Sequence, residues 1–152
     1  MPLGEPHWWL TKDADDRARA FFEHHYSRIV RPEGNKPKLF VGPGQKLVLV
    51  TYDYDALFVW RRFIDDCINV ATGKRQTGVN CAIFRNQSKI KASELIRQAD
   101  AIADHCWPDQ RHYTYVNADC VRSTNPGCCF KMAGWKSCGH TQKGLLILER
   151  CH

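Results

Sequence analysis

A chain of 152 residues and 17.5 kDa has the size of one ordinary domain and can bury a hydrophobic core without disulfides or metals. It is 43% hydrophobic, and no apolar run approaches the roughly eighteen residues that a membrane span needs, which predicts a soluble globular protein without a membrane partner. Lys and Arg number 22 against 16 Asp and Glu, and the net charge of +6 favours association with polyanions, although charge alone names no partner and solvated basic faces are the alternative. The start "MPLGEPHWWLTKDADD" has no basic segment followed by an apolar one, so we expect a cytoplasmic protein.

The cysteines have the spacing of neither a disulfide framework nor a zinc site, because no two of them form a C-x-x-C pair. Several fall in apolar runs, where Cys acts as a small hydrophobe, so we expect free and mostly buried thiols. A second interpretation is a site in which the last two strands form a hairpin that brings four side chains together. These are Cys138, His140, Cys151 and His152.

The first half of the chain predicts a helix and then strands. Apolar positions between residues 13 and 26 recur with helical period. The runs "KLVLVTY" and "ALFVWRRF" predict a hairpin over residues 46–63, in which Asp53 and Asp55 are turn residues. The run "GVNCAIFRN", residues 78–86, predicts a third strand. Before these elements, Trp8 and Trp9 either dock on the domain or stack on a nucleobase.

The second half predicts alternating helices and strands. Residues 92–107 form an amphipathic helix, residues 111–117 a strand, and residues 134–139 and 144–150 two further strands. Between them, Asn125 and Pro126 predict the start of a short helix, and Gly134 predicts its left-handed end. The apolar face of the long helix consists of Leu95, Ile96, Ala99, Ile102, Ala103 and Cys106.

This order of elements predicts an α/β (α+β) fold with one domain over residues 1–152. The sequence has no internal repeat and no linker between separately patterned halves. We therefore expect one mixed, mostly antiparallel sheet with helices on both faces.

The strand "YTYVN" followed by "NPGCCFKMAGW" resembles the C-terminal half of GNAT acyltransferases, in which a strand leads to a short helix ending in a phrase F-x-x-x-G-F/W. Phe130, Gly134 and Trp135 stand at those places, and the order of elements resembles GNAT over residues 10–150. The resemblance implies a GNAT-like domain whose middle strands, 78–86 and 112–117, splay apart. It also implies an acyl donor, acetyl-CoA or a related compound, in the gap between them.

The chain departs from the GNAT pattern in the loop after residue 86. GNAT enzymes hold the pyrophosphate of coenzyme A with a glycine-bearing loop, but "RNQSKIKAS" contains no glycine. Polar side chains at this loop and at the entry of the short helix are the alternative donor-binding groups, although Asn86 and Ser88 suit a helix start equally well and Asn125 is mainly a helix cap. The candidates are Asn86, Ser88, Lys89, Asn117, Arg122, Ser123 and Asn125.

The phrase "FFEHHYSR", together with the altered loop, is similar to the Mom group of phage proteins, GNAT-like enzymes that add a carbamoylmethyl group to adenine in DNA. This likeness implies that His25, Tyr26 and Ser27 line the catalytic pocket, that iron is bound with His25 as the first candidate ligand, and that DNA is the partner. A half-buried His on a helix face is the other interpretation of His25. Tyr115 is the remaining catalytic candidate, and a cross-strand pair is its structural alternative.

Three functions are therefore compatible with the sequence. The first is a GNAT-like transferase of phage or prophage type, acting in the host cytoplasm, that modifies a DNA nucleobase flipped out of the duplex. The second is a conventional acetyl-CoA-dependent N-acetyltransferase on a protein or small-molecule amine, with Tyr115 as general acid. The third is a protein without enzymatic activity that binds nucleic acid or a host protein on the same scaffold.

Overall fold

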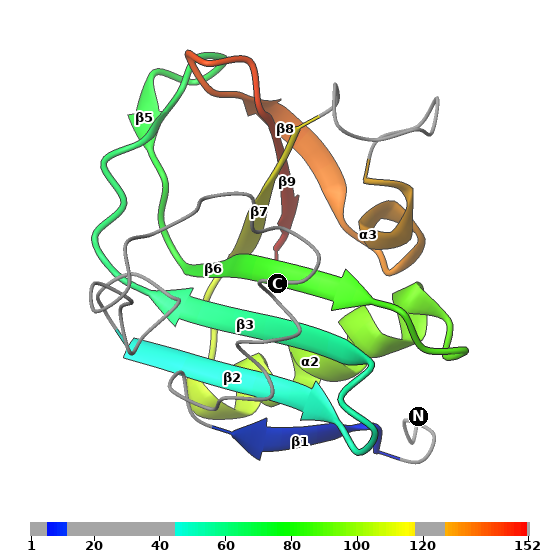
Figure 1. Cartoon of the computed structure of the whole chain (residues 1–152). Coiled ribbons are helices and arrows are strands. Elements are labelled where there is room, and N and C mark those ends of the chain that lie inside the picture. The colour runs from blue at the N-terminus through cyan, green and yellow to red at the C-terminus, as the bar shows by residue number, and fades with distance from the viewer. Residues whose placement is uncertain (1–5, 12–44, 118–126, 152) are drawn as a thin grey trace, which may run out of the picture.

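The computed structural model describes residues 6–11, 45–117 and 127–151 (Figure 1). Their elements in chain order are β1 Trp8–Thr11, β2 Gln45–Thr51, β3 Ala56–Arg62, β4 Ile68–Asn69, β5 Lys74–Arg75, β6 Val79–Asn86, α2 Ala92–Cys106, β7 His112–Val116, α3 Cys128–Met132, β8 Lys136–His140 and β9 Leu146–Arg150. No helix in these ranges is both long and apolar enough to cross a membrane.

Seven strands form one mixed sheet in the order β1-β2-β3-β6-β7-β9-β8, and β4 and β5 form a separate two-stranded hairpin. All neighbours in the large sheet are antiparallel except β6 and β7, which are parallel. A parallel pair needs a crossover, and the crossover here is α2. In Figure 1, β7, β9 and β8 run at a steep angle to β2, β3 and β6.

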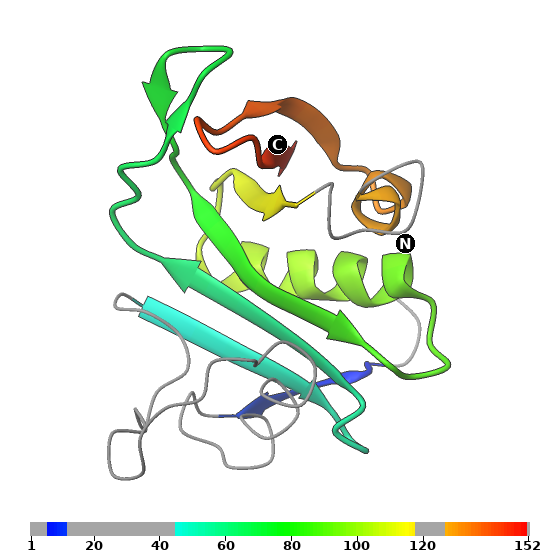
Figure 2. The same ribbon diagram turned by 45° about the horizontal axis from the view of Figure 1, so that its top comes forward.

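The main core lies between one face of the sheet and the two described helices, α2 and α3. Figure 2 shows both helices beside the sheet. Leu95, Ile96 and Ala99 of α2 pack there because the apolar positions of the helix recur with its period. Two indole N–H groups fix the helix to the sheet, since Trp8 donates to Leu95 O at 2.8 Å and Trp60 donates to Ala99 O at 2.9 Å. A second apolar cluster, on the other face of β2 and β3, contains Val48, Val50, Leu57 and Val59.

The structure confirms the predicted β2–β3 hairpin, the strand β6, the helix α2, the strand β7 and the terminal hairpin β8–β9. It also confirms the mixed, mostly antiparallel sheet of an α+β fold. The predicted helix over residues 13–26 lies outside the described residues, so helices on both faces, like the single domain over 1–152, stay predictions. The docking of an N-terminal aromatic is confirmed for Trp8, whereas Trp9 is 59% exposed.

Four local predictions were wrong or missing. Strand β1 and the β4–β5 hairpin were not predicted, because both are short and lack a clear alternation. The short helix α3 begins at Cys128 with Gly127, at φ of +76°, as its N-cap, later than the start predicted at Asn125 and Pro126, and Asn125 lies outside the described residues. Cys106 is exposed rather than part of the buried face, because it is the last residue of α2.

Candidate functional site

The structure places the described site candidates at the ends of the two parallel strands. Asn86 is the last residue of β6, Ser88 and Lys89 belong to the loop between β6 and α2, and Tyr115 and Asn117 lie at the end of β7. The other candidates lie outside the described residues, and their roles stay predictions. They are His25, Tyr26, Ser27, Arg122, Ser123 and Asn125.

The parallel pairing of β6 and β7 is short. Its register contains only Val79 with His112 and Asn80 with Tyr113, although β6 continues to Asn86. Just beyond this point β6 carries a bulge, because Val59 opposes Ile83 whereas Trp60 opposes Cys81, which leaves Ala82 as the extra residue. A bulge bends its strand and increases its twist. The two strands therefore separate toward their C-terminal ends.

Side chains bridge the start of this gap. The Thr114 hydroxyl donates to the Cys81 carbonyl at 2.9 Å in place of a backbone ladder bond. Burial raises the pKa of the Cys81 thiol and also that of Cys129, whose side chain packs against the same core. Neither thiol is an activated nucleophile, since the thiolate is the reactive form.

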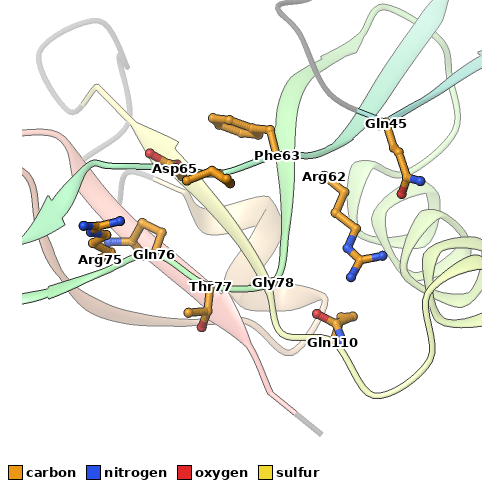
Figure 3. Close-up of a pocket in the computed structure, with 10 residues that line it drawn as sticks. Gln45, Arg62, Phe63, Asp65, Arg75, Gln76, Thr77, Gly78 and Gln110 are labelled. Atoms are coloured by element: carbon orange, nitrogen blue, oxygen red, sulfur yellow. The ribbon is translucent and has the colours of Figure 1, made fainter.

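Tyr115 belongs to a hydrogen-bonded cluster centred on Asp65. The hydroxyl groups of Tyr113 and Tyr115 both donate to Asp65 Oδ2, each at 2.7 Å, and the Cys67 backbone N–H donates to Oδ1 at 3.0 Å. The two tyrosines are two residues apart on β7 and so share one face of the strand. Asp65, in the segment after β3, is buried, and it also lines the groove shown in Figure 3.

The electrostatics of this cluster keep both tyrosines protonated. Burial raises the pKa of Tyr113, and the hydrogen bond to Asp65 and its charge raise it further. Burial also raises the pKa of Tyr115, and hydrogen bonds to Asp65 and to the Cys67 side chain, followed by the charge of Asp65, raise it further. Both hydroxyl protons point at Asp65, so that neither tyrosine is a base. The Tyr115 oxygen can still accept a hydrogen bond from a ligand N–H.

A cavity of about 290 Å³ lies beside Tyr115. Its walls come from the β3–β4 connection, through Cys67 and Ile68, from Tyr115 of β7, and from the β8–β9 turn, through Thr141 and Leu145. Small-molecule sites usually combine an apolar lining with few polar groups, and their volumes begin at about 300 Å³. The cavity therefore has the size and the lining of a site for one small ring or chain end.

The loop between β6 and α2 is closed by its own polar side chains. Asn86 Oδ1 accepts from the Ser88 backbone N–H at 2.9 Å and from the Ser88 hydroxyl at 2.5 Å, and Asn86 Nδ2 donates to Ile90 O at 2.8 Å. Asn86 and Ser88 therefore shape the loop, which favours the helix-start interpretation over donor binding. Lys89 is exposed and lines a second cavity, of about 490 Å³, next to Trp9 and Tyr52.

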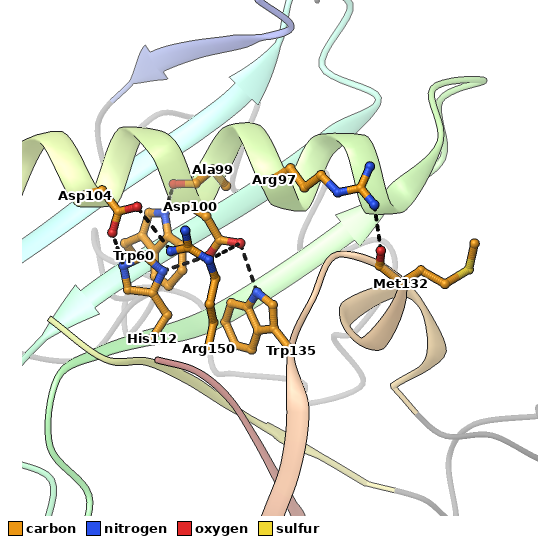
Figure 4. Close-up of polar contacts among 9 residues, drawn as sticks. All are labelled: Trp60, Arg97, Ala99, Asp100, Asp104, His112, Met132, Trp135 and Arg150. Atoms are coloured by element: carbon orange, nitrogen blue, oxygen red, sulfur yellow. Dashed lines mark hydrogen bonds and ion pairs between the residues drawn. The ribbon is translucent and has the colours of Figure 1, made fainter. Parts of the chain in front are cut away.

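A buried polar network on the α2 face of the sheet was not predicted (Figure 4). His112 Nδ1 lies 2.7 Å from Asp100 Oδ1, and its Nε2 lies 3.2 Å from Asp104 Oδ1. Trp135 Nε1 donates to Asp100 Oδ2 at 2.9 Å, and Arg150 Nη1 pairs with Asp104 at 3.1 Å. The network joins α2 to β7, β9 and the start of β8, so it serves the fold. Asp100 and Asp104 are one helical turn apart, which was the available sequence signal.

The metal predictions gain no support from the described ranges. There, no group of three or more His, Cys, Asp or Glu side chains could hold a metal ion, and His25 and His152 lie outside them. The described cysteines are free, among them Cys138 and Cys151. Arg111 instead contacts Cys138 Sγ at 3.5 Å.

Comparison of the chain with protein-family models, with curated proteins and with solved structures found no match. The geometry of β6, β7 and the Asp65 cluster is therefore the basis for assigning a function.

Proposed function

We propose that this chain is a GNAT-like transferase of the Mom type, which adds a group to a nucleobase of DNA. The observation that supports the proposal most is the pair β6 and β7, the one parallel pair of the large sheet, whose strands separate after two residue pairs beside a bulge. In GNAT acyltransferases the donor lies in such a gap between the fourth and fifth strands. The order β1-β2-β3-β6-β7-β9-β8, with α2 as the crossover, supports our proposal that β6 and β7 correspond to those two strands.

The loop at the donor end favours a donor other than ordinary acetyl-CoA. The segment from Asn86 to Lys91 contains no glycine, and Asn86 and Ser88 bond to each other and to the loop backbone. Side chains at these positions restrict the approach of a pyrophosphate to the backbone. Lys89 and Lys91 are exposed cations of this segment, and Lys89, which also lines the cavity beside Trp9 and Tyr52, is the residue that we assign to a donor anion.

The cavity at Tyr115 is the proposed acceptor site. Its apolar walls suit the faces of a base, and the Tyr115 oxygen can accept an N–H of an exocyclic amino group while its own proton is held by Asp65. In the transfer the amino nitrogen bonds to the carbon of the donated group, the leaving group departs with the electron pair of the broken bond, and the nitrogen releases one proton to water. Tyr115 orients the amine for this step. Adenine carbamoylmethylation is the reaction that the Mom resemblance implies.

A base inside a duplex cannot reach this cavity, so the target base has to leave the stack. The net charge of +6 supports a DNA partner, because neutralising backbone phosphates releases counterions. The charge of the chain therefore favours a DNA base over a free amine as the molecule that receives the transferred group.

The test is nucleoside analysis of DNA from cells that express the protein. The DNA is digested to nucleosides and compared by mass spectrometry with DNA from cells that carry the empty vector. The proposal predicts a nucleoside of increased mass. Only unmodified nucleosides, together with micromolar binding of acetyl-CoA in calorimetry and no DNA binding, would identify a conventional N-acetyltransferase instead. DNA binding that survives Tyr115→Phe, without any modified nucleoside, would identify a binding protein.

A further inference from the structure

An open groove of about 620 Å³ is lined in part by Asp65, whose carboxylate accepts a hydrogen bond from Tyr115 of the neighbouring cavity. It is formed by the end of β3 and the following segment, by residues 75–78 before β6, and by Gln45 and Gln110. Figure 3 shows Arg62 and Gln110 on one side of it and Arg75 and Gln76 on the other, with Thr77 and Gly78 between them. The functional assignment above does not use this groove.

The charged groups of the groove are predominantly cationic. Arg62 is exposed and makes no ion pair with any residue of the described ranges. Arg75 pairs with Asp66 at 3.3 Å, but both side chains are largely exposed, so that this pair is weak and open to exchange. The carboxylate of Asp65 already accepts three hydrogen bonds, which compensate its charge. Two guanidinium groups are therefore available to an anion.

Gln76 supplies an independent indication of a ligand. Only 7% of the residue is exposed, and its Oε1 accepts from Arg111 Nη2 at 3.0 Å. Since the Arg111 guanidinium can only donate, this bond requires the amide oxygen of Gln76 to face Arg111, and Nε2 of the same amide faces away from it. Nε2 has no hydrogen-bond partner among the described residues. A buried donor without a partner costs free energy unless an acceptor from outside the chain completes it.

Arg111 holds this wall of the groove in place. Its guanidinium also donates to Thr77 O at 3.0 Å and to Glu149 Oε1 at 2.7 Å, which ties residues 76 and 77 to β9. At Gly78, with φ of +106°, a Cβ atom would lie 2.0 Å from Arg111 O. The backbone therefore approaches Arg111 as closely as glycine permits, and the Gln76 amide is held in one orientation before any ligand arrives.

We propose that the groove binds phosphodiester groups of the DNA strand whose base enters the Tyr115 cavity. This inference rests on the proposed function in taking DNA as the partner. Arg62 and Arg75 supply charge-assisted donors from two sides, and Gln76, which also lines the groove, supplies its unpaired Nε2 donor. Because Asp65 lines the groove and also binds Tyr115, a strand held by its phosphates passes directly beside the acceptor site.

The experiment measures the affinity of the full chain for a fluorescein-labelled DNA duplex by anisotropy over a series of chloride concentrations. For Arg62→Gln with Arg75→Gln, we expect the slope of log K against log salt to become shallower by about 0.9 for each arginine. For Gln76→Glu, which keeps the acceptor for Arg111 but replaces the free donor by a carboxylate, we expect an affinity loss of about tenfold or more. Lys136→Gln, which removes one charge from exposed β8 as the single variant Arg62→Gln does from the groove, is the control and should keep the wild-type slope within about one third of a unit.

Melting temperatures show whether each variant is folded. If the double variant does not fold, the single variant Arg62→Gln, which changes an exposed side chain, is used to test the inference. The inference is overturned if the folded arginine variants keep the wild-type slope, or if inorganic phosphate or a free nucleotide binds at the groove but DNA does not. Nucleoside analysis separates this outcome from failure of the proposed function. Modified nucleosides with unchanged binding by the variants refute the groove alone, whereas arginine-dependent binding without modified nucleosides refutes the proposed function alone.

Discussion

Removing the carboxylate of Asp65 should destabilise the protein by about 4 kcal/mol, because three donors lose one acceptor group. The hydroxyl of Tyr113 contributes most. It donates to Asp65 at 2.7 Å and its residue is 1% exposed, so that water does not replace the lost partner, and a stranded buried donor costs about 2 kcal/mol. Tyr115 and the Cys67 N–H are only partly buried, so each adds about 1 kcal/mol.

Urea unfolding followed by tryptophan fluorescence measures this loss for Asp65→Ala, with Asp66→Ala as the matched control. Asp66 is the next residue and its side chain is 81% exposed, so its removal should change the free energy of unfolding by less than about 0.5 kcal/mol. Tyr113→Phe should cost about 1.5 kcal/mol in the wild type, whereas in Asp65→Ala it should recover up to about 2 kcal/mol, since it removes the buried donor that has lost its acceptor. A cost below about 1 kcal/mol for Asp65→Ala, or additive effects in the double variant, would refute the reasoning.

Three further predictions concern the framework of the site. Asp100→Ala leaves the fully buried His112 without its Nδ1 partner and should lower the free energy of unfolding by about 3 kcal/mol or more, measured in the same urea assay. Gly78→Ala should lower the melting temperature by several degrees, because its Cβ would overlap the carbonyl of Arg111; an unchanged melting temperature would contradict that contact. Burial raises the pKa of Glu149, but the hydrogen bond and charge of Arg111 outweigh it and leave the pKa below the usual value of 4.5. The ion pair therefore contributes stability above pH 4.5 that is lost as the pH falls through the lowered pKa, and Glu149→Gln should remove this part of the acid dependence in a pH series of thermal melts.

The sequence predicts the strongly patterned part of the fold. The β2–β3 hairpin, β6, α2 and the terminal hairpin have long apolar runs with a clear period, and each lies within a few residues of its predicted place. β1 has only four residues, and its pairing with β2 depends on a strand far away in the chain. The start of α3 was misplaced because Asn125 and Pro126 have the composition of a helix start, whereas Gly127 takes the N-cap position in the fold.

The candidate site is less predictable, because tertiary contacts define it. Tyr115 was predicted from its place at the end of a strand. Asp65 was not, since "RRFIDDC" contains two adjacent aspartates with no pattern that separates them, and only the fold buries the first and exposes the second. Gln76 likewise has no sequence signal, because its importance comes from Arg111, 35 residues away. The local periodicity of a sequence reports which face of an element is buried, but it does not reveal hydrogen bonds between residues that lie far apart in the chain.

The proposed reaction at the Tyr115 cavity is tested most directly by the ratio of modified to unmodified nucleoside in DNA from cells that express the wild type, Tyr115→Phe or Lys136→Gln at equal protein levels. A new nucleoside is expected with the wild type and with Lys136→Gln, whose exposed side chain lies outside the cavity. Tyr115→Phe should reduce the ratio by about 10²-fold while remaining folded, because the hydroxyl that orients the acceptor is lost. Equal ratios in all three, or no modified nucleoside in any of them, would contradict the assignment of this cavity.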